Sequence, residues 1–433
     1  MRTLSFQTLV PDRRGGEHGA MNDFDPDERA WWRAALAVAA VGWGAQQFAP
    51  LLLMYRARLG LSATTVQATF GMYVLGLVPG LLLGGPVSDR YGRRRVLVPA
   101  LAVSAAGTAL LVLGGTGAGW LFAGRLVAGI ASGAAFSAGS AWIKELSASR
   151  AGAAPRRLTI AMSVGFGLGP LVAGVLAQWA PAPSVLPYAP HLLLAAVALP
   201  LAARARETRR PDAARGGLRD ALRVPEARGR RFLTVVVPLA PWVFASAAVA
   251  LAYLPAQLGD RLGGYALVYS AAVATLASAA GIAVQPIARR ARTPQRLRTA
   301  ALGLVIAGML VAAGAAAATS PWPAVAAALV LGAGYGSCQV CGLQEVQRLA
   351  RPDRLAALTS VYQAVSYLGF AVPFPLAAAG RFAPPAVLLL VMAGLAVLTL
   401  AIPALVRTAD PALTVRTPPT AQPEAAAARN VRR

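Results

Sequence analysis

Twelve apolar segments divide this chain of 433 residues. A run of about 20 apolar residues is the length that an α-helix needs to cross the hydrocarbon core of a membrane. The chain is 57% hydrophobic and 13% charged, which is far too little charge for a soluble protein of this length. We therefore predict an all-α membrane protein with 12 transmembrane helices. The predicted helices cover residues 33–54, 63–86, 96–113, 119–142, 158–180, 187–203, 233–254, 264–286, 299–318, 323–344, 356–378 and 384–406.

The basic residues between these segments predict how the chain crosses the membrane. The net charge of +24 would suit a nucleic-acid binder, but the charge lies in short loops between apolar runs, so we expect no nucleic-acid partner. Of the 41 Lys and Arg residues, 26 lie in loops on one side and four in loops on the other. Because short basic loops stay in the cytoplasm, we expect a multi-pass protein of the cytoplasmic (inner) membrane with both termini inside.

The longest of the basic loops falls at the midpoint of the segments and predicts two halves. The halves align weakly at an offset of 200 residues, where Glu145 meets Glu345 and Gly169 meets Gly369. Such internal repeats are common in transporters. The predicted organisation is a cytoplasmic tail over 1–32, a six-helix bundle over 33–203, a cytoplasmic linker over 204–232, a pseudo-symmetric second bundle over 233–406 and a disordered tail over 407–433.

A basic turn over residues 84–95 joins the second and third segments. Gly85 lets another helix approach closely, and Gly92 lets the backbone reverse. Asp89 is a lone carboxylate among arginines, so we expect it to be paired or to face the positive end of a helix. The pattern is Gly-x-x-x-Asp-Arg-x-Gly-Arg-Arg, formed by Gly85, Asp89, Arg90, Gly92, Arg93 and Arg94.

This pattern resembles the signature between the second and third helices of the major facilitator superfamily of secondary transporters. The resemblance implies the twelve-helix fold of that family, with two bundles around a central cavity. It also implies that Asp89 contacts the eleventh helix near Asp353 and Arg354 and latches the two halves together on the cytoplasmic side.

Arg125 is a charged residue inside the fourth segment, about five residues from its outer end. A buried charge is costly unless it finds a partner or reaches the interface, so Arg125 is either a functional interior residue or a structural one that snorkels. The run from Arg125 to Gly133 resembles the fourth-helix pattern of the superfamily, in which an Arg before glycines is linked to proton transfer.

The fifth segment carries glycines about one turn apart, which make a smooth face for close helix packing, and a proline that kinks the helix. Ordinary small-residue packing would explain them. The pattern nevertheless resembles the antiporter signature of exporters in the superfamily, with Ala173 where the family has a glycine. Its residues are Gly165, Gly169, Pro170 and Gly174.

Polar and aromatic residues on the first, fourth, seventh and tenth segments would line the central cavity if the fold is as implied. Within an apolar helix, the two amides of Gln46 and Gln47 need partners. The few charges of such a cavity would suit neutral, lipophilic or weakly cationic compounds. The candidates are Trp43, Gln46, Gln47, Phe136, Ser137, Ser140, Trp242, Tyr335 and Gln339.

Glu145 and Glu345 lie at the inner ends of the fourth and tenth segments. We expect them to pair with loop charges, Glu145 with Arg150 and Glu345 with Arg348; a gating role at the inner rim is the alternative. No Asp or Glu lies deep in an apolar segment, so the candidates for coupling to protons are Arg125, the carboxylates Asp89, Glu145 and Glu345 and, on the outer side, His191 and Asp260.

These features predict a secondary active transporter that resembles the twelve-helix drug/proton antiporters. We expect it to act as a monomer in the lipid bilayer and to export a small molecule by alternating access, with protons as the coupling ion. The alternatives are an importer or facilitator of a sugar, organic acid or other metabolite, and a non-transporting sensor. The chain contains no P-loop pattern and no clustered catalytic set, so we expect no enzyme activity, cofactor or metal.

Overall fold

The computed structural model describes residues 30–148, 153–209, 224–351 and 354–408, and all the regular structure in these ranges is helical. Twelve helical stretches within them are long and apolar enough to cross a membrane, which confirms the predicted number. They are Trp31–Leu59, Ala63–Tyr91, Arg93–Thr116, Ala118–Glu145, Ala153–Trp179, Leu186–Ala203, Phe232–Arg261, Gly263–Arg289, Pro294–Ala318, Pro321–Leu349, Leu355–Ala379 and Pro385–Pro403.

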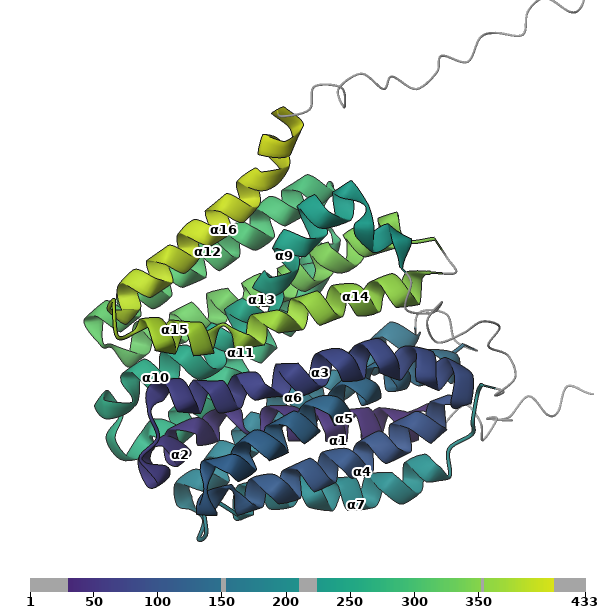
Figure 1. The fold of residues 1–433 in the computed structure, drawn as a ribbon, viewed down its shortest axis with the longest axis horizontal. Coiled ribbons are helices and arrows are strands. Elements are labelled where there is room, and N and C mark those ends of the chain that lie inside the picture. The colour runs from purple at the N-terminus through teal and green to yellow at the C-terminus, as the bar shows by residue number, and fades with distance from the viewer. Residues whose placement is uncertain (1–29, 149–152, 210–223, 352–353, 409–433) are drawn as a thin grey trace, which may run out of the picture.

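The first six spans form one bundle and the last six form the other (Figure 1). The first bundle contains α1 (Trp31–Gln46), η2 (Ala49–Leu51), α2 (Leu52–Leu59), α3 (Ala63–Tyr91), α4 (Arg93–Val112), α5 (Ala118–Glu145), α6 (Ala153–Trp179), η4 (Leu186–Tyr188) and α7 (Ala189–Ala203). The second contains η7 (Phe232–Val236), α9 (Val237–Ala248), η8 (Val249–Tyr253), α10 (Leu254–Leu258), α11 (Ala266–Arg289), α12 (Pro294–Ala318), α13 (Pro321–Leu349), α14 (Leu355–Tyr367), η11 (Leu368–Ala371), α15 (Pro373–Ala379) and α16 (Pro385–Thr408).

The first span is broken rather than continuous. Pro50 has no backbone N–H, so the carbonyl of Gln46 loses the donor that a continuous helix would supply. The helix therefore ends as α1 at Gln46, turns through η2 and resumes as α2.

Glycines hold α3 and α5 in backbone contact. A methyl group at Gly133 of α5 would lie 2.3 Å from the carbonyl oxygen of Leu77 in α3, and one at Gly80 of α3 would lie 2.5 Å from that of Ile130 in α5. The second half repeats the arrangement, because a methyl at Gly336 of α13 would lie 2.0 Å from the carbonyl oxygen of Gly281 in α11. Small residues let membrane helices approach this closely. Each half therefore contains an equivalent pair of interlocked helices, α3 with α5 and α11 with α13.

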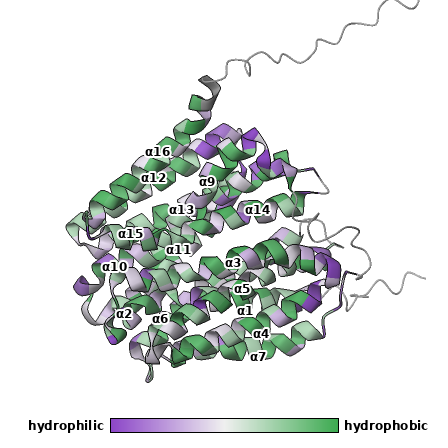
Figure 2. Ribbon diagram, in the orientation of Figure 1, coloured by the Kyte–Doolittle hydropathy of each residue, from purple (hydrophilic) through white to green (hydrophobic). Residues whose placement is uncertain are grey.

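The two halves meet along two pairs of spans (Figure 1). In one pair α3 contacts α14 and α15, which belong to the same span, and in the other α6 contacts α11. Hydrophilic residues gather where α3 ends and α4 begins (Figure 2). We call this the arginine-rich end, because the turns around residues 90–95, 204–209, 225–231, 289–298 and 348–351 all lie at it; the other is the arginine-poor end.

Candidate functional site

Arg93, the first residue of α4, is the centre of a charged cluster at the arginine-rich end. Its buried guanidinium donates from Nη2 to Asp89 Oδ1 at 2.5 Å and to Glu145 Oε1 at 2.9 Å, and from Nη1 to Ser88 Oγ at 2.7 Å. Charge-assisted hydrogen bonds of this kind are the strongest that side chains make. The cluster therefore ties the ends of α3, α4 and α5 together.

Glu207, which the sequence analysis did not single out, caps the start of α4. Its two carboxylate oxygens accept from the backbone N–H groups of Arg93 at 2.8 Å and Arg94 at 3.0 Å. These N–H groups have no partner inside the helix, and the helix dipole favours a negative charge there. Gly92 makes the approach possible, because its φ of 109° suits glycine and a methyl group there would lie 2.6 Å from Glu207 Oε2.

In the second half, Glu345 of α13 occupies the position that corresponds to Glu145, and its side chain is almost fully buried. Its Oε2 accepts from Arg231 Nη2 at 3.0 Å and from Arg231 Nε at 3.2 Å, and its Oε1 accepts from Arg348 Nη1 at 3.1 Å. Glu345 thus joins α13 to the residue before η7. The ion pair with Arg348 confirms that part of the sequence prediction.

The other two carboxylates both pair with Arg93, which confirms that Asp89 is paired as expected, while the expected contacts with Arg150 and with the eleventh helix stay predictions. Glu145 pairs with Arg93 and accepts from Thr208 Oγ1, and its expected partner Arg150 lies outside the described residues. Asp89 pairs with Arg93 of its own half. The expected contact of Asp89 with the eleventh helix stays a prediction, since Asp353 also lies outside the described residues.

Of the other arginines of the turn, Arg94 donates from Nη1 to the carbonyl oxygens of Ala203 and Ala205 at 3.2 and 3.3 Å, and so joins α4 to the end of α7. The guanidinium of Arg90 lies 5.9 Å from the ring centre of Tyr91. Gly85 of α3 lies against α5 and faces the other half, because a methyl group there would be 2.9 Å from Ser137 Oγ and 4.0 Å from Ser360 Oγ.

Arg125 is buried inside the first half, with 2% of its surface exposed. Its Nη1 donates to the carbonyl oxygen of Ala45 at 3.0 Å and its Nη2 to that of Phe70 at 3.3 Å. Aromatic rings surround the guanidinium, with the ring centre of Tyr73 at 4.4 Å and that of Phe48 at 5.0 Å. Cation–π contacts and backbone carbonyls thus stabilise the charge of the guanidinium in place of a carboxylate. The side chain points inward and does not snorkel.

A second buried polar group, formed by His191 of α7 and Thr108 of α4, packs against α1, because a methyl group at Gly44 would lie 2.7 Å from the ring of His191. His191 Nδ1 lies 2.8 Å from Thr108 Oγ1, which also accepts from Gln47 Nε2 at 3.1 Å. Gln47 therefore finds its partner on α4. The sequence placed His191 only near the outer end of its segment and gave no sign of its contact with Thr108.

Aromatic side chains fill the middle of the protein where the halves meet. Phe370 of η11 lies 5.7 Å from Phe70 of α3, ring centre to ring centre, and 4.7 Å from Phe244 of α9. Phe244 stacks on Tyr367 at 4.1 Å and lies 5.6 Å from Tyr335. This cluster joins both halves, and Tyr335 is the predicted cavity residue that belongs to it.

The other predicted cavity residues are dispersed. Phe136 packs edge-on against Phe166 at 5.6 Å, Gln339 Nε2 donates to Gln363 Oε1 at 3.1 Å, and Ser140 Oγ donates to the carbonyl oxygen of Ser137 at 3.1 Å. Gln46 is buried at the end of α1. Trp242 Nε1 donates to Thr399 of α16 at 3.0 Å, so its indole faces that helix.

The glycines of α6 lie against two different helices. Methyl groups at Gly165 and Gly169 would lie 2.4 Å from the carbonyl oxygen of Ala39 and 3.0 Å from that of Trp43, both in α1. A methyl group at Gly174 would lie 2.3 Å from Ala271 Cβ of α11, in the other half. Glycines on different faces of α6, with the buried Pro170 between Gly169 and Gly174, thus contact helices of both halves.

Comparison with known proteins identifies similar folds. The model of the Major Facilitator Superfamily matches residues 34–373. No curated protein sequence matches the chain. Among solved structures, a mutant of the nucleoside transporter NupG has a TM-score of 0.70 at 12% identity, and the human organic anion transporter MFSD10 has a TM-score of 0.57 at 19% identity. Each alignment covers 87% of this chain and 99% of the other. At these identities the similarity concerns the fold alone.

Proposed function

Because this chain belongs to the Major Facilitator Superfamily, we propose that it exports a small molecule across the cytoplasmic membrane by alternating access, in exchange for protons. The arginine-rich end then faces the cytoplasm, as the distribution of basic loops predicts. Rocking of the two bundles about a site near the middle of the membrane is how such paired bundles expose a substrate to each side in turn.

Contacts between the halves support this mechanism. Near the arginine-poor end, Gln67 Nε2 of α3 donates to the carbonyl oxygen of Ala252 at 3.1 Å, and Gln178 of α6 bonds to the backbone of Gly264 and Val268. At the arginine-rich end, the ion pairs of Arg93 and of Glu345 each join residues of one half. Such a pattern suits a transporter whose outer end is closed while its two halves are held separately at the inner end.

The glycines of α6 are the observation that carries the proposed direction of transport. Gly165 packs directly on the backbone of α1, and Gly174, on another face of the helix, packs on the small side chain of Ala271 in α11 of the other half. A helix with small residues toward both halves can serve as the surface on which they rock. The same residues resemble the antiporter signature of exporters, and this resemblance favours efflux over uptake.

For the coupling to protons we propose the carboxylates of the arginine-rich end. Protonation of Glu145 would remove its ion pair with Arg93 and leave that guanidinium to Asp89, so the ends of α4 and α5 would no longer be joined. Glu345 would act likewise between Arg231 and Arg348. Arg125 would keep α1, α3 and α5 in register through its two carbonyl partners.

A facilitator without proton coupling is the second candidate. The acidic residues among the described ranges all lie at or beyond the ends of spans, and the middle of the membrane holds none of them. Such an arrangement would suit a carrier whose cycle needs no proton.

Transport by the purified full-length chain in proteoliposomes tests both candidates. A panel of lipophilic compounds and small metabolites is offered with and without an imposed pH gradient, and substrate and proton movements are recorded together. Proton movement opposite to substrate movement, lost in Glu145→Gln, supports the antiporter. Substrate movement that does not depend on the pH gradient contradicts the antiporter and supports the facilitator. Movement of substrate and protons in the same direction would contradict both.

A further inference from the structure

The two halves carry matching basic turns but differ in how the charge of each turn is balanced. In the first half, the turn between α3 and α4 has three carboxylates close by: Asp89, Glu145 and Glu207. At the offset of 200 residues, Glu145 keeps a counterpart in Glu345, but Arg289 stands where Asp89 would be and Arg407 where Glu207 would be. Residues 289–298, from the last residue of α11 into the first turns of α12, contain five arginines and no acidic residue.

Beside this second turn, a groove opens between α11 and α12. Both helices pack chiefly on α13, and the groove between them has a volume of about 310 Å³. Its walls are apolar, and Ser337 of α13 lies at its floor. Arg292 and Arg296, both exposed, stand at its arginine-rich end. The apolar lining comprises Val284, Ile287, Ala288, Ala291, Leu297, Ala300 and Leu304.

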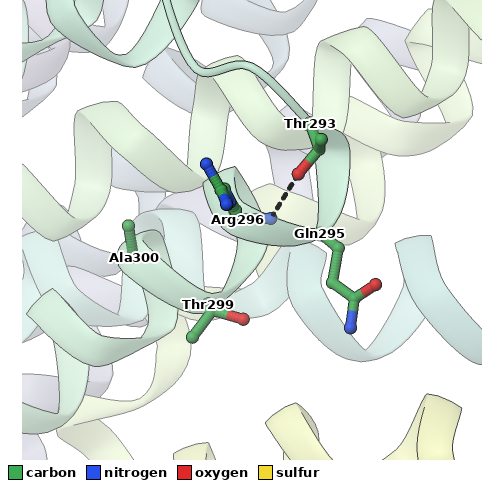
Figure 3. A pocket seen from close by; sticks show the side chains of 5 residues that line it. All are labelled: Thr293, Gln295, Arg296, Thr299 and Ala300. Atoms are coloured by element: carbon green, nitrogen blue, oxygen red, sulfur yellow. Dashed lines mark hydrogen bonds between the residues drawn. The ribbon is translucent and has the colours of Figure 1, made fainter.

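A second cavity, of about 510 Å³, shares Arg296 and Ala300 with the groove. Figure 3 shows the side chains that line this second cavity. It lies over the start of α12, where Thr293 Oγ1 accepts from the backbone N–H of Arg296 at 3.2 Å. Neither cavity has an acidic residue among those that line it. The positive end of α12 and two guanidinium groups therefore face an open space that can accept an anion.

We propose that this groove binds an anionic phospholipid. The phosphate lies at Arg292 and Arg296, and an acyl chain lies against Ile287, Leu297 and Leu304. A soluble anion would use the arginines but not the apolar walls, whereas a lipid uses both. Basic pockets between transmembrane helices are suited to such headgroups, and Arg binds phosphate through two parallel hydrogen bonds. The lipid would supply to the second half the negative charge that Asp89 and Glu207 supply to the first.

Native mass spectrometry of the full-length chain, released from detergent and titrated with phosphatidylglycerol or phosphatidylcholine, tests the proposal. We expect the wild type to retain phosphatidylglycerol in preference to phosphatidylcholine. The variant Arg292→Ala/Arg296→Ala should lose roughly tenfold in affinity for phosphatidylglycerol, because each basic residue near a lipid surface contributes a substantial share of the attraction. Arg292→Lys/Arg296→Lys, which keeps the charge, should retain most of the preference.

The matched control is Arg95→Ala/Arg156→Ala. It removes the same charge from exposed residues of the first half at the same end of the molecule. We expect it to bind phosphatidylglycerol as the wild type does. An equal loss in both double variants would overturn the proposal, because overall charge and not the groove would then explain the binding.

Ala300→Trp separates a lipid from a free anion. The exposed Ala300 lines both cavities, so an indole there fills the space of the acyl chain without removing a charge. We expect it to weaken phosphatidylglycerol binding, and we expect inorganic phosphate at the same concentration not to displace the lipid. Displacement by phosphate together with unchanged binding in Ala300→Trp would mean an anion site without a lipid, and would contradict the proposal, as would equal retention of the two lipids by the wild type.

Discussion

The guanidinium of Arg93 lies 2.9 Å from the carboxylate of Glu145, and the two residues are the first of α4 and the last of α5. The same guanidinium lies 2.5 Å from Asp89 at the end of α3. One buried side chain thus connects three helices at an end where Arg90, Arg94, Arg95 and Lys144 would otherwise repel one another. The cluster explains how so basic a turn can be packed tightly.

Replacement of Arg93 by alanine should destabilise the protein. It removes the partner of two carboxylates, and both are partly exposed, so water compensates for some of the loss. We expect the free energy of unfolding to fall by about 1–2 kcal/mol. Thermal unfolding in detergent measures it, with the exposed Arg95→Ala as the control. A melting temperature equal to that of Arg95→Ala would mean that the ion pairs contribute nothing.

Glu207 should matter to stability although it lies in a loop. Glu207→Ala leaves the N–H groups of Arg93 and Arg94 without their acceptor, and the loss of a helix cap costs about 1 kcal/mol. The same unfolding measurement tests it against Asp260→Asn, which alters an exposed acid near the other end. If the two variants have equal melting temperatures, the capping contacts do not stabilise the protein.

The apolar runs sufficed to predict the twelve spans, because the length of a membrane helix is set by the bilayer and not by its neighbours. The pair of Glu345 with Arg348 was likewise predictable, since residues three apart face the same side of a helix. The contact of Glu145 with Arg93 joins residues 52 positions apart, and that of Glu207 with Arg93 joins residues 114 apart. No local sequence pattern indicates such contacts. The one available signal was that Asp89 is a lone carboxylate among arginines, which indicates an ion pair but not its partners.

The directions in which side chains point inside the bundle could also not be predicted from the sequence. Gln47 and Trp242 were placed on the cavity because of the segments they belong to, but a helix has several faces. The amide of Gln47 bonds to Thr108 of α4 and the indole of Trp242 to Thr399 of α16. Which face of a helix meets which neighbour depends on rotation within the bundle, and the nearly uniform apolar surface of a membrane span does not encode it.

The interlocked glycines of α3 and α5 should tolerate no side chain. A methyl group in Gly133→Ala would lie 2.3 Å from a backbone oxygen that cannot move without its helix. We expect overpacking to cost about 1–3 kcal/mol. The control is Gly314→Ala in α12, where nothing lies within 4 Å. Equal melting temperatures for the two variants would show that the helices can separate at little cost.

Asp89 offers a test of alternating access itself. Its side chain is 41% exposed and pairs with Arg93 of its own half, so it is accessible to a partner from the other half in a second state. On our proposal, Asp89→Asn weakens the state closed at the arginine-rich end and leaves the substrate site, which lies in the middle of the membrane, unaltered. The variant should therefore change the balance of the two states more than the affinity for substrate.

Spin labels on Arg95 and Arg290, exposed residues of opposite halves at the arginine-rich end, report that balance in a variant lacking Cys338 and Cys341. We expect the population of the longer distance to rise several-fold in Asp89→Asn and to stay unchanged in Asp260→Asn, because the latter acid lies at the opposite end. Identical distance distributions in the two variants would contradict the latch. A large loss of substrate affinity in Asp89→Asn with unchanged distances would instead place Asp89 in the substrate site, and the proposed division between the arginine-rich end and the middle of the membrane would be wrong.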